Sequence, residues 1–339
     1  TEAIALLRRW AQSRESSAAV IALEHRHAID PSHLLDLAED LLKHQDAAVR
    51  RLAAQSLAAA PNSDRLETLA SLLQDVNLSL RTWAGQKLVE FGQQPEWNEV
   101  VIANMVSRLD SDSWRDLEQA MAVLAQLDHK PIAQRLVLLL DHERPEVFIT
   151  AAWALREIQV PESLEPMLDK AERLFGEFQA NAEQNPFPPA AQVIQLSQLF
   201  QAFGAMKWQR SEPLLREFVP KIHELGDRSR TAACWSLGYL YEDNAPDDLV
   251  QMLIQRMLDR DPQDPELRNV RVASAISLGR MQARAAIDPL RHLLKSEGAN
   301  DPLGQACGWA LEELTGEPRP EPRPRSYRMT SWFLTPILD

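Results

Sequence analysis

The sequence predicts an all-α protein, an α-solenoid in which about nine helical hairpins stack into a superhelix. Three observations carry this prediction. A short motif recurs along the 339 residues, and each copy is followed by another amphipathic segment. Leu and Ala dominate the apolar residues and only 11 residues are Gly, a mix that favours helix over strand. No stretch alternates polar and apolar residues over the length of a strand.

The recurring motif is a residue that is often Arg, two residues of any type, two small residues, two of any type, and then Leu. The clear copies end at Leu57, Leu88, Leu237 and Leu278, and weaker copies end at Leu23, Leu124, Leu155, Phe203 and Leu311. The small pair lets neighbouring helices approach each other, and the Leu fills the space between them. The repeating unit is therefore a hairpin of about 34 residues that buries its apolar face by stacking.

The segments between the motifs, such as "PNSDRLETLASLLQD" and "AAIDPLRHLLKSE", space their Leu residues three and four apart and therefore predict helices. Asp-Pro pairs at Asp30–Pro31, Asp288–Pro289 and Asp301–Pro302 predict an N-cap followed by Pro in the first turn.

Two parts of the chain depart from the repeat, which extends over residues 1–316. Residues 162–189 predict an overlong helix, about Glu162 to Ala182, that "NPFPP" brings to an end. This segment is either a spacer or a docking ridge formed by Phe175, Phe178 and Phe187. The acidic stretch "DRDPQDPEL" predicts a solvated loop.

The C-terminal residues 317–339 form a Pro/Arg-rich extended tail with an aromatic end that includes Trp332 and Phe333. An open solenoid end needs a cap, so we expect this tail to fold back over the last repeats. The alternative is that the tail is a ligand motif for another protein.

The segments "DAAVRRLAAQSL", "NVRVASAISLGRM" and "ARAAIDPLRHLLKSE" resemble HEAT repeats, of the short subtype that also occurs in phycobilisome lyases. The resemblance covers nearly the whole chain. It implies a solenoid of the kind that mostly serves as a scaffold or binding surface. The family's Asp-to-Arg ladder is kept at Asp46 and Arg50 and at Asp227 and Arg230. Other residues stand in place of the Arg elsewhere, namely Leu117, Phe148, Leu196 and Gly304.

The formal net charge of −13 argues against a nucleic-acid groove and favours a basic protein or peptide as the partner. No run of 18 apolar residues occurs, which predicts no membrane insertion. No signal peptide is recognised, which favours the cytoplasm, although the chain starts at Thr1 and could be part of a longer protein. Cys234 and Cys307 lie among small apolar residues and are expected to be buried free thiols.

The sequence contains no motif that identifies a catalytic, cofactor or metal site, so none is predicted and the protein is expected not to be an enzyme. His142–Glu143 and His223–Glu224 are His-Glu pairs, as in the di-iron hydroxylases that resemble this fold, but they precede their helices instead of lying within them. Glu24, His25, His27 and His33 include a His pair that diverges around a helix, which disfavours a metal. DNA glycosylases of this fold use a basic concave groove, which the acidic composition disfavours, and no residue pattern picks out the tetrapyrrole pocket that a bilin lyase of this fold would need.

One position in the motif is the best functional signal. The residue two before the terminal Leu lies about 160° around the helix from it, on the side opposite the core. In successive repeats Trp153, Gln201, Trp235, Ile276 and Trp309 occupy this position. In HEAT-like solenoids the helix that carries this motif lines the inner surface, so the resemblance implies that these five residues face the concave side.

We therefore expect these five residues to bind a protein or peptide, because exposed aromatic groups mark binding surfaces and Trp is enriched at their energetic centres. The alternative is that each Trp lies flat on an adjacent helix or under the tail. The sequence favours a non-enzymatic interaction scaffold. A cofactor-handling or lyase-like enzyme on the same solenoid, and a regulatory domain of a longer multidomain chain, stay open.

Overall fold

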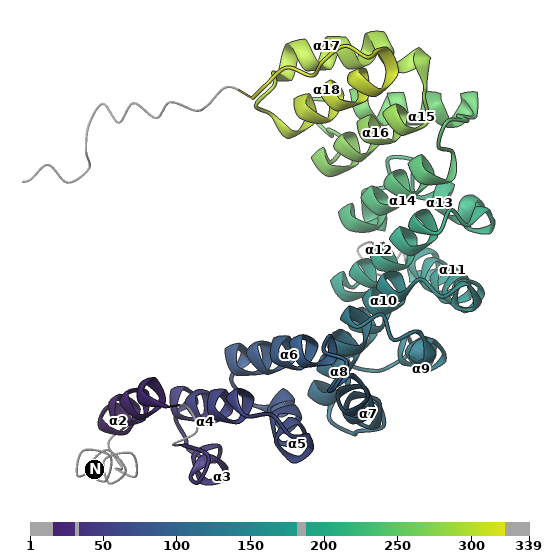
Figure 1. Ribbon diagram of the computed structural model, residues 1–339. Coiled ribbons are helices and arrows are strands. Elements are labelled where there is room, and N and C mark those ends of the chain that lie inside the picture. The colour runs from purple at the N-terminus through teal and green to yellow at the C-terminus, as the bar shows by residue number, and fades with distance from the viewer. Residues whose placement is uncertain (1–15, 31–33, 182–187, 323–339) are drawn as a thin grey trace, which may run out of the picture. The chain divides into compact units, whose positions relative to one another are not determined.

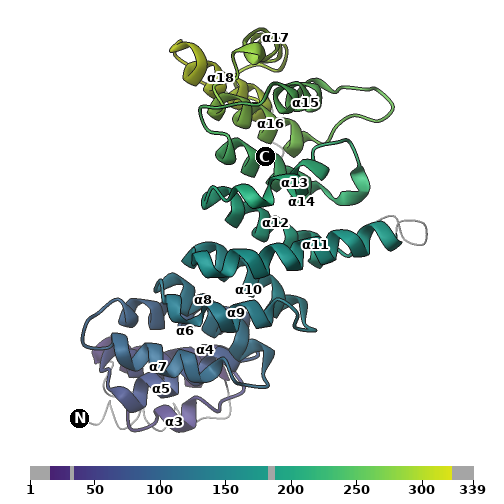
Figure 2. The ribbon, with the colours of Figure 1, turned by 90° about the vertical axis from the view of Figure 1, so that its right-hand side faces the viewer.

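The structure, a computed structural model, describes residues 16–30, 34–181 and 188–322. Within these residues the regular elements are helices and no strand occurs. Within each unit, hairpins of helices pack on their neighbours in chain order, as Figure 1 and Figure 2 show, so the predicted α-solenoid architecture is confirmed. Contacts within the chain divide it into two compact units, unit 1 from Thr1 to Leu174 and unit 2 from Phe175 to Asp339.

The helices that carry the repeated motif, here called motif helices, alternate with intervening helices. In unit 1 the motif helices are α2 (Ser16–Ile29), α4 (Ala47–Ala59), α6 (Leu78–Gly92), α8 (Trp114–Gln126) and α10 (Pro145–Ile158). The intervening helices are α3 (Ala38–Leu41), α5 (Ser63–Ser71) with the 3-10 turn η2 (Leu72–Gln74), α7 (Asn98–Arg108), and α9 (Ala133–Leu139) after η3 (Lys130–Ile132). The long helix α11 (Leu164–Asn181), preceded by η4 (Pro161–Ser163), passes through the boundary between the units.

Unit 2 continues the same alternation. Its motif helices are α12 (Ala190–Ala205), α14 (Asp227–Leu240), α16 (Arg268–Arg280) and α18 (Pro302–Thr315). The intervening elements are η5 (Gln209–Ser211) with α13 (Glu212–Glu217), η6 (His223–Leu225), α15 (Asp247–Leu258), and η7 (Arg284–Ala286) with α17 (Ile287–Glu297). The four motif helices of unit 2 pack side by side in one row, which Figure 1 shows in teal to yellow.

The terminal residues of the nine motif copies form the core. Each lies on a different motif helix and each is buried: Leu23, Leu57, Leu88, Leu124, Leu155, Phe203, Leu237, Leu278 and Leu311. The helical period therefore identified the buried side of these helices correctly. The predicted buried thiols are also confirmed, since Cys234 and Cys307 are both buried and free.

The motif helices of unit 2 approach each other unusually closely because of glycines at their contacts, among them Gly204 and Gly238. A methyl group added at Gly204 would lie 2.7 Å from the Cα atom of Ser236, and one added at Gly238 would lie 2.9 Å from the Cα atom of Ser277. The hydroxyl of Ser236 donates to the carbonyl of Phe200, and that of Ser277 donates to the carbonyl of Cys234, at 2.6 and 2.7 Å. The same Gly–Ser contact thus joins α12 to α14 and α14 to α16.

The arginine seven residues before the terminal Leu secures the turns between helices. Arg50 donates two hydrogen bonds to the carboxylate of Asp75, both of 2.7 Å, and another to the carbonyl of His44. Asp46 instead caps α4 by accepting from the N–H of Ala48. The resemblance implied an Asp-to-Arg ladder that includes Asp46 and Arg50. In the structure Arg50 forms its ion pair with Asp75, in the turn that precedes α6.

In unit 2 the corresponding Arg230 is fully buried and pairs with both carboxylate oxygens of Glu266, at 2.7 Å each. Arg256 lies 3.3 Å from the same carboxylate. Glu266 belongs to the acidic stretch that was predicted to be a solvated loop. That prediction is wrong for this residue, because the turn is fastened to the core by its one buried carboxylate.

Some local predictions also needed the structure. Asp301 caps α18 by accepting from the N–H of Leu303, and Pro302 follows it, as predicted. Asp288 does not cap α17, because that helix begins at Ile287 and already contains Asp288 and Pro289. Pro31 lies outside the described residues.

The predicted Phe ridge is wrong at two positions. Phe178 is buried and the ring of Phe175 packs 5.3 Å from that of Phe218, while Phe187 lies outside the described residues.

The described part of the C-terminal tail, residues 317–322, lies against the last hairpin. Glu317 pairs with Arg291 of α17 at 2.7 Å, and Arg319 lies 3.5 Å from the carboxylate of Glu312. Arg319 and Pro320 pass close to Gly308 of α18. Trp332 and Phe333 lie outside the described residues.

Candidate functional site

The five predicted binding residues have a common environment but belong to two units. Trp153 lies on α10 in unit 1, and Gln201, Trp235, Ile276 and Trp309 lie on the four motif helices of unit 2. All five side chains are half-buried. The row of packed helices brings the four positions of unit 2 onto one surface, which we call the motif-helix face of unit 2.

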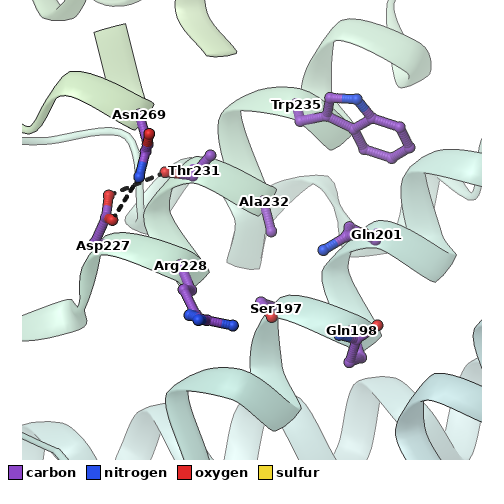
Figure 3. Close-up of a pocket in the computed structure, with 9 residues that line it drawn as sticks. All are labelled: Ser197, Gln198, Gln201, Asp227, Arg228, Thr231, Ala232, Trp235 and Asn269. Atoms are coloured by element: carbon purple, nitrogen blue, oxygen red, sulfur yellow. Dashed lines mark hydrogen bonds between the residues drawn. The ribbon is translucent and has the colours of Figure 1, made fainter. Parts of the chain in front are cut away.

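A hollow of about 500 Å³ opens on this face. Three consecutive motif helices contribute its walls: α12, α14 and the start of α16. The lining residues, drawn in Figure 3, are Ser197, Gln198, Gln201, Asp227, Arg228, Thr231, Ala232, Trp235 and Asn269. Two of the predicted residues, Gln201 and Trp235, therefore take part in one cavity.

Most of the lining is polar, and its groups differ in what they can still bind. The carboxylate of Asp227 accepts a 2.8 Å hydrogen bond from the amide of Asn269 and a longer one from the hydroxyl of Thr231. Figure 3 shows these two bonds as dashed lines. The Oε1 atom of Gln198 is buried and has no hydrogen-bond partner. Arg228 is exposed and forms no ion pair with another described residue. The hollow thus offers an unused amide oxygen and an unused cation.

Next to the hollow, Trp235 belongs to an aromatic cluster that encloses an arginine. The ring of Trp235 lies 4.3 Å from that of Tyr239. The guanidinium of Arg280 lies 3.8 Å from the centre of the Tyr239 ring, 5.4 Å from that of Trp235 and 5.9 Å from that of Trp309. Desolvation among these rings lowers the pKa of Arg280, and its Nη1 atom is buried without a hydrogen-bond partner.

Sequence reasoning missed Tyr239 and Arg280. Tyr239 lies one helical turn after Trp235, which places it on the same side of α14, so the helical period could have identified it. Arg280 lies two residues after the terminal Leu of the next repeat. Only the close packing of α14 against α16 brings it to Trp235.

Unit 1 has related contacts on its own motif helices. The guanidinium of Arg51 lies 4.7 Å from the centre of the Trp83 ring, and that of Arg115 lies 4.5 Å from the centre of the Trp114 ring. Desolvation lowers the pKa of Arg51. The sequence did not single out these residues because they occupy other positions of the motif than Trp153.

The structure also places most of the His residues that the sequence offers as candidate metal ligands. Within residues 16–30, 34–181 and 188–322, no three His, Cys, Asp or Glu side chains come together as a metal site would require. His27 hydrogen-bonds the hydroxyl of Ser56 and His25 is exposed, while His33 lies outside the described part of the chain. His142 accepts from the N–H of Arg144, and His223 pairs with Asp264. Among the described helices, none is both long and apolar enough to cross a membrane.

Comparison with protein families gives two matches, one in each unit. Residues 34–123 match the family model for HEAT repeats, and residues 270–296 match that for the PBS lyase HEAT-like repeat. The chain therefore contains HEAT repeats in both units. The second match lies on α16 and α17 and ends just before the loop that leads to α18. No curated protein sequence matches this HEAT-repeat chain.

Two structures of importin beta show the same fold. A structure of importin beta matches with a TM-score of 0.60 at 16% identity and covers 92% of this chain and 49% of importin beta. A second importin beta structure gives a TM-score of 0.58 at 15% identity, with coverage of 92% and 47%. The chain thus spans about half the length of importin beta. The complex of CpcE and CpcF of phycocyanin lyase from Nostoc matches at a TM-score of 0.44 and 16% identity, covering 74% of this chain and 94% of that one.

Proposed function

We propose that this HEAT-repeat protein is a non-enzymatic scaffold that binds a protein or peptide segment along its motif helices. One observation carries the proposal: the hollow of about 500 Å³ is lined by three consecutive motif helices and contains the predicted residues Gln201 and Trp235. A cavity built across repeats suits an extended chain that passes from one helix to the next.

The lining fits the chemistry of such a segment. Each residue of an extended peptide presents one N–H donor and one C=O acceptor, and the side-chain amide of Gln198, which lines the hollow, is of a type that can pair with both. Trp235 supplies a large half-buried apolar surface beside them. Helices packed about 9 Å apart place three motif helices across roughly 18 Å, which is the length of about five to six extended residues.

A peptide-display library panned on the full chain tests the proposal. We expect enriched sequences whose binding is weakened by Trp235→Ala and by Gln201→Ala. Gln255→Ala is the matched control, because Gln255 is exposed on the intervening helix α15, away from the hollow. Failure to enrich any peptide, or enriched peptides that bind all three variants equally, would contradict the proposal. Melting curves of each variant separate loss of binding from loss of folding.

The match of residues 270–296 to the PBS lyase HEAT-like repeat supports a second candidate, a cofactor-handling or lyase-like role. Absorbance spectra and metal analysis of the protein purified from its native source distinguish the two candidates. A stoichiometric chromophore or iron would favour the second one. Peptide binding at the hollow without either would favour the scaffold.

A further inference from the structure

The arginines on the motif helices include two groups with different surroundings, besides Arg26, Arg156 and Arg268, which form ion pairs elsewhere on these helices. Those seven residues before the terminal Leu serve the fold: each donates to a carboxylate or to a backbone carbonyl of the chain itself. They are Arg50, Arg81, Arg230 and Arg271. A second group lies elsewhere on these helices and forms no ion pair with another described residue. These residues, here called the free arginines, are Arg51 and Arg115 in unit 1 and Arg228 and Arg280 in unit 2.

The free arginines lie beside tryptophan. Arg51, Arg115 and Arg280 stack on Trp rings, and Arg228 shares the hollow with Trp235. Nitrogen atoms of the three stacked guanidinium groups are buried without a hydrogen-bond partner: Nε of Arg51, Nε of Arg115 and Nη1 of Arg280. These three nitrogens face the protein interior, so a carboxylate would pair with the other nitrogens of each guanidinium. Guanidinium groups bind carboxylates strongly because they can form two parallel hydrogen bonds to them.

The same surroundings disfavour a cation as the ligand. The rings of Trp235 and Tyr239, which could attract a cation, already enclose Arg280. The carboxylate of Asp227 already accepts from Asn269 and Thr231. The net charge of −13 belongs to the whole chain. Salt screens charges that lie more than about 8 Å from a ligand, so the side chains that the ligand contacts matter more than the net charge. The exposed carboxylate of Glu242 also interacts with Arg280, but it is paired with Lys207. The carboxylates of Asp227 and Glu242 are therefore both already engaged.

We propose that the motif-helix face of unit 2 binds an acidic protein segment, whose carboxylates pair with Arg228 and Arg280 on either side of Trp235. This inference rests on the proposed scaffold function and specifies its partner. Arg228 and Arg280 lie 11 residues apart in the repeat alignment, which at 1.5 Å per residue is about 16 Å along the helices and roughly 19 Å with the step to the next helix. Two acidic residues about six positions apart in an extended peptide span that distance.

The segment that fits has apolar residues between its two acids, because Trp235 and Ile276 lie on the same face between the arginines. Nucleic acid fits less well. It requires a dense row of phosphate contacts, and the motif-helix face of unit 2 offers two free arginines, on a chain whose net charge is −13.

Fluorescence anisotropy with defined probes tests the inference on the full chain. The probes are a labelled peptide with two glutamates about six positions apart and leucines between them, its glutamine counterpart, its lysine counterpart, and a single-stranded DNA oligonucleotide of similar length. We expect the glutamate peptide to bind at least about tenfold more tightly than the glutamine peptide and to weaken as salt increases. We expect the lysine peptide and the oligonucleotide to bind least.

Variants assign the effect to the free arginines. Arg228→Gln should reduce affinity for the glutamate peptide about tenfold while leaving the glutamine peptide unaffected. Arg284→Gln is the matched control, because Arg284 is exposed and unpaired among the described residues but lies in η7, away from the motif helices. Arg280→Gln should have a similar effect, and the exposed Arg228 keeps the test decisive if Arg280→Gln disturbs folding.

The outcomes separate the two proposals. Equal binding of the glutamate and glutamine peptides, both lost in Trp235→Ala, would overturn the acidic partner and leave the scaffold function standing. Tighter binding of the lysine peptide or of the oligonucleotide would also overturn it. If neither these peptides nor any library peptide binds the face, both proposals fail.

Discussion

Replacing Gly238 with alanine tests the close packing of the motif helices in unit 2. The added methyl group would lie 2.5 Å from the hydroxyl oxygen of Ser277, 2.7 Å from its Cβ atom and 2.9 Å from its Cα atom. Because the last of these is a backbone atom, a rotamer change cannot relieve the contact and α16 has to move away from α14.

The magnitude follows from three contributions. Overpacking a tight interface costs about 1–3 kcal/mol. Moving α16 also weakens the buried hydrogen bond from Ser277 to the carbonyl of Cys234, which contributes about 1 kcal/mol. Alanine favours a helix over glycine by up to about 1 kcal/mol, which offsets part of this loss. We expect a net destabilisation of about 1–3 kcal/mol.

Thermal unfolding followed by circular dichroism measures this effect. For a unit of this size, each kcal/mol lowers the melting temperature by about 2–4 °C. Gly176→Ala is the matched control, because Gly176 also lies within a helix, α11, and has no atom within 4 Å of an added methyl group. That variant should gain stability. If Gly238→Ala gains as much as Gly176→Ala, the close approach of α14 and α16 is refuted.

Three further predictions follow from the buried polar groups. Glu266→Gln should destabilise the chain by about 3–5 kcal/mol in urea unfolding, because it leaves the fully buried Arg230 without its counter-charge; an unchanged midpoint would contradict this. Burial would raise the pKa of Glu266, but the hydrogen bonds and charge of Arg230, the N–H of Leu267 and the charge of Arg256 together outweigh it and hold the pKa below its usual range. The stability due to Glu266 is therefore present above about pH 4.5 and is lost as the pH falls below that value, so Glu266→Gln should flatten the pH profile of the urea midpoint there. Burial raises the pKa of Cys234 to about 11 and that of Cys307 to about 12, so neither thiol should react with a disulfide reagent at pH 8 until the chain is unfolded; rapid reaction of the native protein would show that the sites open.

The sequence predicted the fold well because the helical period alone decides which side of a motif helix is buried. Each terminal residue from Leu23 to Leu311 is buried for this reason. The turns between helices follow no periodic sequence pattern from which their course could be predicted. The partners of Arg50 and Arg230, which are Asp75 and Glu266, lie in turns whose course depends on packing between hairpins.

The candidate site could be predicted only in part for a similar reason. The position two before the terminal Leu does bring Gln201 and Trp235 to one hollow. What surrounds Trp235 depends on how closely the next helix approaches, and that distance is set by Gly238 and Ser277. The enclosure of Arg280 by aromatic rings is therefore a consequence of helix spacing, which the sequence of one repeat does not contain.

The described tail, residues 317–322, affects whether a further helical hairpin could stack on the end of the solenoid. In unit 2, motif helices contact the next motif helix through two positions, three residues before and one residue after the terminal residue of the motif. On α14 these residues are Cys234 and Gly238. On α18 these positions are Gly308 and Glu312, and both are covered by Arg319 and its neighbours. The surface on which a further hairpin, or the first hairpin of a second molecule, would stack is therefore already occupied. The described tail therefore caps the last hairpin, and removing it would expose the side of α18 that corresponds to the packed sides of the earlier motif helices.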